Sequence, residues 1–463
     1  MSQVSTESGS FRDRRGRIYY VDNRVLRTVM PMAVADFDFV RQSGLIEDLH
    51  EQGKLTGENL VDVELLGEFG ADAHYVVEHP RLPFISYPYE WSFSALKAAA
   101  MLHLDIQQQA LKKDVTLTDA TAYNVQFLGH RPIFIDNLSF RRYVEGEYWA
   151  GHRQFFEQFV NPLLLRAVNG VPFNAWYRGE LEGVSAQDLS RVLPWRTRLS
   201  WNVLTNVHMQ ARLQNAAPSS GAVEKAKLRK LPRIGFEQML HSLKKWISGL
   251  QPKEDGKTVW QDYANDNSYD EQEAVNKRAF IAEFCQAVKP PLILDIGCNT
   301  GDYSIHALDN GAGLAVGFDF DHGALEYAYR RASDTNREFL PLHLDAANPS
   351  PDQGWGQAER MGFAERAKGD AVLGLALIHH LAIAKNLPLA QVIGWLVDMA
   401  PQGVLEFVPK SDPMAQRLLQ MREDLFDDYD QASFERYLAD QARIVKTAAV
   451  SSSGRVLYWF DRG

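Results

Sequence analysis

From residue 292 onwards, short apolar runs alternate with longer segments in which apolar positions recur with a helical period. The apolar runs predict strands, and the segments between them predict helices. Strands that alternate with helices in this way form a mostly parallel sheet covered on both faces. The predicted strands are Leu292–Asp295, Ala315–Asp319, Phe339–Leu344, Ala371–Ala376, Gly403–Phe407, Arg443–Val450 and Arg455–Phe460.

The last two predicted strands are separated only by the turn sequence SSSG at 451–454. A connection this short joins antiparallel neighbours, because parallel strands need a long crossover. The sequence therefore predicts an α/β fold with a Rossmann-like, seven-stranded sheet that ends in an antiparallel strand. Such an ending is unusual among dinucleotide-binding folds.

The front of the chain has a different pattern, with short strand-like runs first and longer helical segments later. Residues 1–10 are polar and are expected to form a disordered tail, and residues 11–214 to form an aromatic-rich α+β domain. The composition then becomes small and polar, and next basic, which predicts a linker and a connecting helix over 215–257. The α/β domain is expected to fill 258–463, with a helix at Glu273–Val288 before its first strand.

Composition narrows the class of protein. The 463 residues carry a net charge of −10, which disfavours broad affinity for nucleic acid. The two cysteines, Cys285 and Cys298, have no zinc-binding spacing, so we expect no disulfide framework and a reducing compartment. No apolar run reaches the roughly 18 residues of a spanning helix, and the first residues lack a signal-peptide core. A cytoplasmic protein without a membrane partner is expected.

The stretch LILDIGCNTGDYS at 292–304 places a carboxylate and two glycines at the end of the first predicted strand. In an open parallel sheet, ligands bind beyond the carboxyl ends of the strands. Gly297 and Gly301 allow a sharp turn there and let a ligand approach bare backbone. Asp295 closes the strand itself. This edge of the sheet is therefore the predicted ligand site.

Two further acids end the next two predicted strands. Asp319 stands about 20 residues after the first acid, the spacing at which an acid accepts two hydrogen bonds from a ribose diol. Asp345 and Ala346 follow the third strand, where they can meet an adenine ring. Acids at three strand ends suit a nucleoside with a cationic appendage and suit a pyrophosphate poorly. The chain also lacks G-x-G-x-x-G at this turn and has no P-loop motif.

The segments LDIGCNTGDYS, GFDFD, LDAAN and GDAVLGLALIHHL resemble the successive motifs of class I S-adenosylmethionine-dependent methyltransferases, over about residues 258–463. The resemblance implies a methyltransferase sheet that binds S-adenosylmethionine. The first motif would surround the methionine part, the second would hold the ribose and the third would meet the adenine. A Rossmann-like domain that binds nothing is the alternative. The predicted cofactor-binding residues are Asp295, Gly297, Cys298, Asn299, Gly301, Asp319, Phe320, Asp345 and Ala346.

The methyl acceptor is expected near the end of the fourth predicted strand, in LGLALIHHLAIAKN. There His379 or His380 could take the acceptor's proton, because imidazole titrates near neutral pH. Either histidine could instead pack or cap the following helix. Glu406, at the end of the fifth strand, is a second acid–base candidate or an ordinary strand-end carboxylate. Three aromatic residues before the domain could form a lid over the cofactor or belong to the core: Trp260, Tyr263 and Tyr269.

The front domain contains VTLTDATAYNVQFLGHRPIFIDNLSF at 115–140, which resembles the catalytic and metal-binding loops of kinase-like phosphotransferases. The resemblance implies that Asp119 positions a hydroxyl while Asn124 and Asp136 hold magnesium. The neighbouring residues depart from that pattern, and neither a glycine-rich phosphate loop nor a clear strand lysine is present. We therefore expect a degenerate kinase-like domain that binds the acceptor or a partner. Active phosphotransfer is a lesser alternative, and no other metal site is predicted.

The whole chain, through YPYEWSF, TAYNVQF, RQFFEQFVNPLLL and the late motifs, resembles bacterial nodulation-related methyltransferases. The two resemblances together imply methyl transfer to an oxygen or nitrogen of a small molecule, saccharide or protein. Nucleic acid is a disfavoured acceptor that the basic linker leaves open, and the oligomeric state is not predicted. The alternative from another class is a catalytically silent scaffold or regulator. A nicotinamide oxidoreductase is disfavoured by the missing second glycine and the terminal hairpin.

Overall fold

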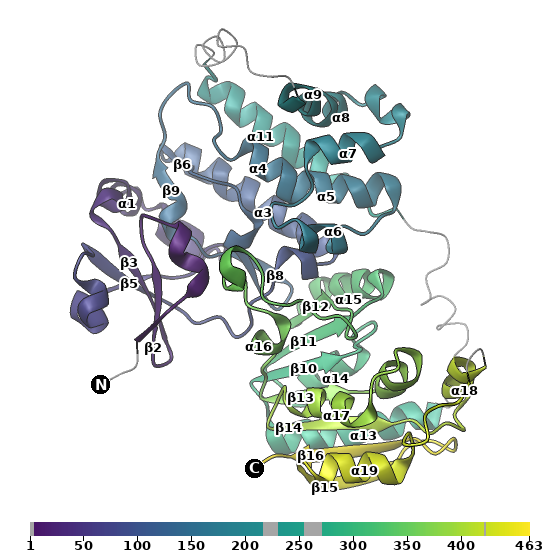
Figure 1. Ribbon diagram of the computed structural model, residues 1–463. Helices are drawn as coiled ribbons and strands as arrows, with labels where there is room; N and C mark the ends of the chain where they lie inside the picture. Colours follow the sequence, from purple (N-terminus) through teal and green to yellow (C-terminus); the bar gives the residue numbers. More distant parts are fainter. Residues whose placement is uncertain (1–3, 216–229, 254–270, 421–422) are drawn as a thin grey trace. The chain divides into compact units, whose positions relative to one another are not determined.

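The computed structural model describes residues 4–215, 230–253, 271–420 and 423–463, and the chain divides into two compact units (Figure 1). The main change of unit, between Asp255 and Gly256, is close to the predicted domain start at 258. This boundary lies outside the described residues, as do most of the predicted linker and the predicted lid residues Trp260, Tyr263 and Tyr269. The first unit comprises Met1–Phe127, Pro132–Asp255 and Asp352–Arg360, and the second Leu128–Arg131, Gly256–Pro351 and Met361–Gly463.

The first unit begins with a five-stranded antiparallel sheet in the order β1-β2-β3-β5-β4. The fully buried side chains of Leu26 and Val76 pack there with Tyr19 and Leu66. Two helices, α1 (Val34–Gln42) and α2 (Leu45–Glu51), connect the third strand to the fourth. The strands are β1 (Val4–Thr6), β2 (Ile18–Val21), β3 (Arg24–Val29), β4 (Asn59–Val61) and β5 (Tyr75–His79).

The disordered tail predicted for residues 1–10 is wrong for its described part. Strand β1 pairs antiparallel with β2, so that Val4 lies opposite Val21. The carboxylate of Glu7 accepts a hydrogen bond from the Tyr20 hydroxyl at 2.6 Å. The polar sequence was misleading because a strand is held by backbone N–H and C=O groups, which do not depend on the polarity of the side chain.

The 20-residue helix α3 (Phe93–Lys112) carries much of the core of the first unit. Ser92 caps it by accepting a hydrogen bond from the Ala95 N–H at 3.1 Å. Two short sheets follow, β6 with β9 and β7 with β8. The kinase-like architecture of this unit stays a prediction. The elements after α3 are β6 (Val115–Leu117), β7 (Val125–Leu128), β8 (Arg131–Phe134), β9 (Phe140–Arg142), α4 (His152–Phe155), α5 (Asn161–Leu164), α6 (Asn174–Gly179), α7 (Ala186–Val192), α8 (Trp201–Val203), α9 (Gln210–Asn215) and α11 (Arg233–Ser248).

The second unit holds a seven-stranded sheet in the order β12-β11-β10-β13-β14-β16-β15. The strands from β12 to β14 are parallel, whereas β16 pairs antiparallel with both β14 and β15. All seven predicted strands and the terminal hairpin are confirmed, with strand ends that differ by no more than two residues. The strands are β10 (Leu292–Ile296), β11 (Leu314–Asp319), β12 (Phe339–His343), β13 (Ala371–Gly374), β14 (Gln402–Phe407), β15 (Arg443–Ala449) and β16 (Val456–Asp461).

Helices cover both faces of this sheet (Figure 1). Because crossovers between parallel strands are right-handed, the helices after β10 and β11 lie on one face and the helix after β13 on the other. The strand order reverses direction between β10 and β13, which marks the switch point where open α/β sheets bind ligands. The helices are α13 (Glu271–Val288), α14 (Asp302–Asp309), α15 (His322–Asp334), α16 (Phe363–Arg366), α17 (Leu389–Val397), α18 (Pro413–Leu419) and α19 (Gln431–Ala439).

The core of the second unit joins the sheet to α13 and its neighbours. Ile293, Ala315 and Phe339 come from three adjacent strands and are fully buried together with Phe284 of α13. The core therefore fixes the three strand ends that carry the predicted acids. Within the part of the chain that the structure describes, no helix has the length and apolar character needed to cross a membrane.

Candidate functional site

A tight turn joins β10 to α14 at the carboxyl end of the first parallel strand. Gly297, Asn299 and Gly301 have φ angles of +86°, +49° and +77°, in the region that favours glycine. A Cβ atom at Gly301 would lie 2.2 Å from Cε1 of Phe339, so no side chain fits there. A Cβ atom at Gly297 would lie 3.6 Å from Cβ and Cδ1 of Leu377, an ordinary packing contact, so it is the positive φ and not a clash that favours glycine there.

Asp319 ties this turn to the end of β11. Its carboxylate accepts hydrogen bonds from the backbone N–H of Asn299 at 2.8 Å and of Asp321 at 2.9 Å. Burial raises the pKa of Asp319, and these backbone hydrogen bonds oppose the rise only in part. Each carboxylate oxygen keeps further lone-pair capacity, so a ligand hydroxyl could still be accepted.

Asp295 is buried at the end of β10, where the Ser304 hydroxyl donates to it at 2.5 Å. Burial raises the pKa of Asp295 to about 7, with a smaller contribution from the charge of Asp319, while the Ser304 hydrogen bond opposes the rise. Neither acid forms an ion pair among the described residues. The turn therefore holds two carboxyl groups whose charged forms a cationic ligand would favour.

Asp345 and Ala346, which are predicted to meet the adenine, follow β12, and Phe320, another predicted cofactor residue, follows β11. Asp345 and Ala346 are half-buried after β12, and the Asp345 carboxylate accepts from the Ala347 N–H at 3.0 Å. Phe320, directly after β11, is 66% exposed, so its ring is not part of the core. Cys298 is buried and its pKa is raised by burial, which suits a packing role and not a nucleophile.

His379 and His380 follow β13, with ring centroids 4.2 Å apart. Ala376 lies between β13 and the two histidines, and its φ of +47° is uncommon for a residue with a side chain. The pKa of the fully buried His379 is lowered by burial first, and then by the charges of His380, Arg455 and Lys277. The charge of Asp412 opposes this lowering in part. Burial and Arg455 lower the pKa of the half-buried His380. Both imidazoles are thus held in the neutral form that can accept a proton.

Glu406, at the end of β14, is completely buried. Its carboxylate lies 2.8 Å from Nζ of Lys277 and 3.5 Å from Nη1 of Arg455, and it accepts from the Ala376 N–H at 3.0 Å. The same two cations lie 2.9 Å and 3.5 Å from the carboxylate of Glu273. This geometry favours a structural counter-ion over the predicted acid–base role.

Four residues of this buried ion cluster were not identified from the sequence. They are Glu273 and Lys277 of α13, Arg455 before β16, and Asp412, to which Arg455 Nε donates at 2.7 Å. The one sequence signal was the Glu–Lys pair four residues apart on a predicted helix. That spacing usually marks an exposed pair, so only packing against distant segments reveals the burial.

In the first unit, the three residues of the kinase-like motif meet. Asn124 Nδ2 donates to Asp119 at 3.3 Å and to Asp136 at 3.2 Å. Arg27 of β3 donates to Asp136 at 2.6 Å and to Asp13 at 2.7 Å. Burial, followed by the charge of Asp136, raises the pKa of Asp119 to about 6.

The buried guanidinium of Arg27 therefore forms ion pairs with Asp136 of the motif and with Asp13. In the described ranges of the chain, no group of three or more His, Cys, Asp and Glu side chains is arranged to hold a metal ion. The magnesium-binding role implied for Asn124 and Asp136 stays a prediction, and in this structure Asp136 pairs with Arg27.

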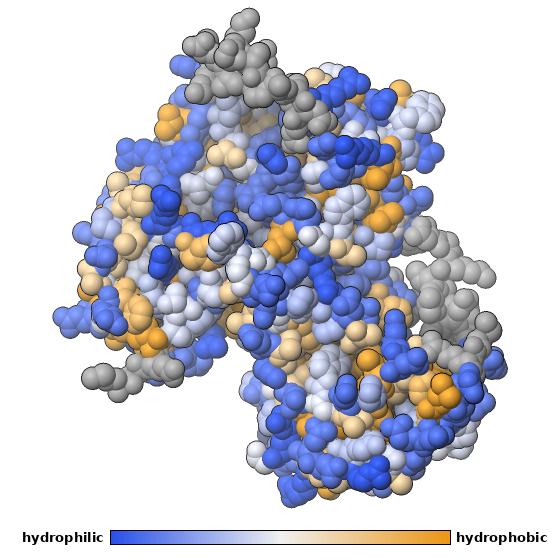
Figure 2. Space-filling view, in the orientation of Figure 1, coloured by the Kyte–Doolittle hydropathy of each residue, from blue (hydrophilic) through white to orange (hydrophobic). Residues whose placement is uncertain are grey.

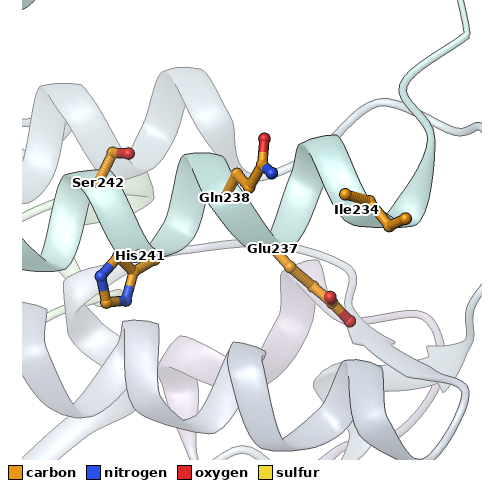
Figure 3. Close-up of a pocket in the computed structure, with 5 residues that line it drawn as sticks. All are labelled: Ile234, Glu237, Gln238, His241 and Ser242. Carbon is orange, nitrogen blue, oxygen red and sulfur yellow. The ribbon is translucent and has the colours of Figure 1, made fainter.

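A surface hollow of about 480 Å³ lies along α11 (Figure 3). Its lining comes from that single helix, with Glu237 and His241 pointing to one side and Gln238 and Ser242 to the other. No predicted site residue lines it. A small-molecule site is normally a cleft that encloses its ligand, so we assign no function to this hollow.

The strand order, the antiparallel seventh strand and the acids at the ends of β10 and β11 together define a class I S-adenosylmethionine-dependent methyltransferase fold. No family model matches the chain. Nodulation protein NoeA of Rhizobium meliloti (strain 1021) is 45% identical over 457 residues, which are 98% of this chain and 96% of that protein. The chain belongs to the family of nodulation protein NoeA, which confirms the resemblance to nodulation proteins.

Two solved methyltransferase structures are also similar to this chain. Magnesium protoporphyrin IX methyltransferase from Synechocystis PCC 6803 is 18% identical and covers 44% of this chain and 93% of its own, with a TM-score of 0.32. N-methyltransferase NodS from Bradyrhizobium japonicum WM9 is 13% identical and covers 42% of this chain and 98% of its own, with a TM-score of 0.31. The assignment of the fold rests on the strand order and not on these overlaps.

Proposed function

We propose that the second unit binds S-adenosylmethionine and transfers its methyl group to an oxygen or nitrogen nucleophile. The observation that carries the proposal is a pair of acids, the buried Asp295 and the half-buried Asp319, at the ends of two adjacent parallel strands beside the switch point of a methyltransferase sheet. Neither acid forms an ion pair among the described residues, and their carboxylates accept from Ser304 and from backbone N–H groups. A cationic ligand would supply the missing positive charge. When bound, S-adenosylmethionine supplies a sulfonium-activated methyl group.

The residues at this edge fit the parts of that ligand. Gly297 carries no side chain, so the ligand could approach the backbone of the turn, and Asp295 offers charge to its cationic methionine part. Asp319 retains lone pairs for the ribose hydroxyls. Asp345 can accept from an adenine amino group, and the exposed ring of Phe320 can cover the adenine plane. The remaining cofactor residues, Cys298, Asn299 and Gly301, shape the turn and do not touch the ligand in this proposal.

The acceptor would be held near the end of β13. His380 is the better candidate for general base, because it is half-buried whereas His379 is 1% exposed. The neutral His380 would take the proton that the acceptor loses as the methyl group arrives. His379 would position the ring of His380, with which it is in contact. Much of the catalysis would come from orientation and exclusion of water.

The acceptor class proposed is a small molecule, saccharide or protein, presented by the first unit. The net charge of −10 favours these acceptors over nucleic acid, which is itself negatively charged. The closed Arg27 cluster supports a binding role for the first unit over phosphotransfer. A cytoplasmic location is part of the same proposal.

The deciding experiment titrates the full-length protein with S-adenosylmethionine and with S-adenosylhomocysteine in a calorimeter. The wild type should bind both, and Asp319→Asn should weaken binding by at least about tenfold, since it removes a charge-assisted hydrogen-bond partner. The matched control is Asp334→Asn, the same change at an exposed acid of α15. No heat with correctly folded wild type would refute the proposal. Binding without formation of S-adenosylhomocysteine from any acceptor would favour the silent scaffold.

A further inference from the structure

The segment from Leu189 to Arg212 is basic within an acidic protein. It contains four arginines and no aspartate or glutamate, although the whole chain has a net charge of −10. It comprises the end of α7, the 3-10 helix Trp195–Leu199, α8 and the helical turns that follow. Figure 2 shows hydrophilic and apolar residues side by side over α7 and α8.

The apolar side chains of this segment divide between two faces. Leu189, Leu193, Val203 and Val207 are buried and hold the segment on the first unit. His208 fixes the loop between the helices, because its ring nitrogens lie 3.0 Å from the Ser190 hydroxyl and 3.3 Å from the Thr197 hydroxyl. The local fold is therefore complete without the outward-facing apolar residues.

The outward face presents large apolar side chains that the fold does not use. Trp195 and Trp201 are each 75% exposed, and Leu199 is 82% exposed. Arg196 and Arg198 stand between them, are exposed, and form no ion pair within the described residues. We call Trp195, Arg196, Arg198, Leu199 and Trp201 the tryptophan–arginine patch.

We propose that the tryptophan–arginine patch binds the surface of an anionic phospholipid membrane. Tryptophan and leucine side chains enter the boundary between headgroups and acyl chains, and arginines contact the phosphates. Arg196 and Arg198 give the charge complementarity, because they form no ion pair among the described residues, whereas Arg191 of the segment is paired with Asp188 just before it. This is attachment to a membrane surface, contrary to the expectation from the sequence that the protein has no membrane partner, and it is independent of the proposed methyl transfer.

Two other occupants suit the patch less well. A second copy packed patch against patch would set arginines against arginines, which is unfavourable. A nucleic acid would use the tryptophans for stacking and the arginines for phosphates, but it leaves no role for the aliphatic side chain of Leu199. A membrane uses all five side chains.

The experiment measures cosedimentation of the full-length protein with vesicles of phosphatidylcholine alone and of phosphatidylcholine mixed with phosphatidylglycerol. The wild type should bind the mixed vesicles and should bind phosphatidylcholine alone much more weakly. Arg196→Gln should reduce the partition coefficient about fivefold. Replacing Trp195, Leu199 and Trp201 together by serine should reduce it at least about tenfold. Trp355→Ser is the matched control, because Trp355 is also 75% exposed but lies outside the patch.

The variants should fold, because the changed side chains are exposed, and thermal melting verifies this. Blue-shifted tryptophan emission on vesicle binding, lost in the triple variant, would add support. Absence of vesicle binding by the wild type, or unchanged binding by a folded triple variant, would overturn the proposal. It would also be overturned if the triple variant turned a wild-type dimer into a monomer without changing vesicle binding. Binding of an RNA oligonucleotide in preference to mixed vesicles would have the same consequence.

Discussion

Replacement of Asp295 by asparagine should stabilise the protein while it impairs the cofactor site. The carboxyl of Asp295 is 1% exposed and its pKa is about 7, against an ordinary value of 3.8. The folded state therefore holds the proton more tightly than the unfolded chain does. Above pH 7 the carboxylate is charged in both states, and folding bears the full cost of burying that charge.

The size of the effect follows from the two pKa values. One pKa unit is worth about 1.36 kcal/mol. The difference between the folded and unfolded pKa of Asp295 therefore lowers the free energy of unfolding by on the order of 4 kcal/mol at about pH 8. A buried asparagine introduces amide hydrogens that cost about 1–3 kcal/mol if they find no acceptor. We therefore expect Asp295→Asn to raise the free energy of unfolding by about 2 kcal/mol at about pH 8.

The pH dependence separates this mechanism from others. Between the unfolded pKa of 3.8 and the folded pKa of about 7, the wild type loses stability through Asp295 as pH rises. Asp295→Asn has no such titrating group. The stability difference between the variant and the wild type should therefore shrink by roughly 2–4 kcal/mol as pH falls from about 8 to about 4.5, where it should vanish or reverse.

Urea unfolding at a series of pH values measures the difference, with Asp334→Asn as the exposed control of the same chemistry. The control should stay within about 0.5 kcal/mol of the wild type throughout. A stability difference for Asp295→Asn that does not change with pH would refute the reasoning. The same variant should bind S-adenosylmethionine at least about tenfold more weakly.

Three further predictions test the packing and the charges. Gly301→Ala should lower the free energy of unfolding by about 2–5 kcal/mol, because the new methyl group would clash with the buried ring of Phe339 and φ is positive. The control is Gly356→Ala, where φ is also positive but no atom lies within 4 Å of the new methyl group, and it should cost only about 1 kcal/mol. Equal losses of stability for the two variants would contradict the clash. Arg27→Met should lower the free energy of unfolding by about 2–3 kcal/mol, since it leaves two partly buried carboxylates without their cation. Arg24→Met, at a more exposed ion pair, should cost less than about 1 kcal/mol. Unchanged stability of Arg27→Met in urea unfolding would contradict the role of this ion pair. Glu406→Gln should lower the free energy of unfolding by about 2–4 kcal/mol, measured by thermal unfolding, because it removes the counter-ion of Lys277 and Arg455. Unchanged stability together with a large loss of kcat would instead support the acid–base role.

The sheet of the second unit could be predicted from local patterns. Each buried strand is a nearly continuous apolar run, and each helix has its own period, so the order of elements can be read along the chain. The turn at Gly297 and the acid at Asp319 were found for the same reason, because both are fixed by their distance from a strand end. The terminal hairpin followed from a connection too short for a crossover.

Other features depended on residues far apart in the chain. Glu406 reads as a strand-end acid, and only the packing of α13 and the residue before β16 surrounds it with Lys277 and Arg455. The local sequence around Asp136 gives no sign of Arg27, more than 100 residues earlier, which donates to its carboxylate. Val4–Thr6 reads as a tail because its pairing uses backbone alone.

The sequence by itself determined the seven-stranded sheet, the glycine turn and the acids at the ends of its strands, because periodicity and strand-end position are local properties. Only the tertiary structure decided which charged groups are neutralised and which apolar groups stay exposed. It closed the cluster around Arg27, made Glu406 a counter-ion, and left Trp195 and Trp201 on the surface. The physical reason is that burial and ion pairing are set by contacts between distant segments, and no short window of sequence records them.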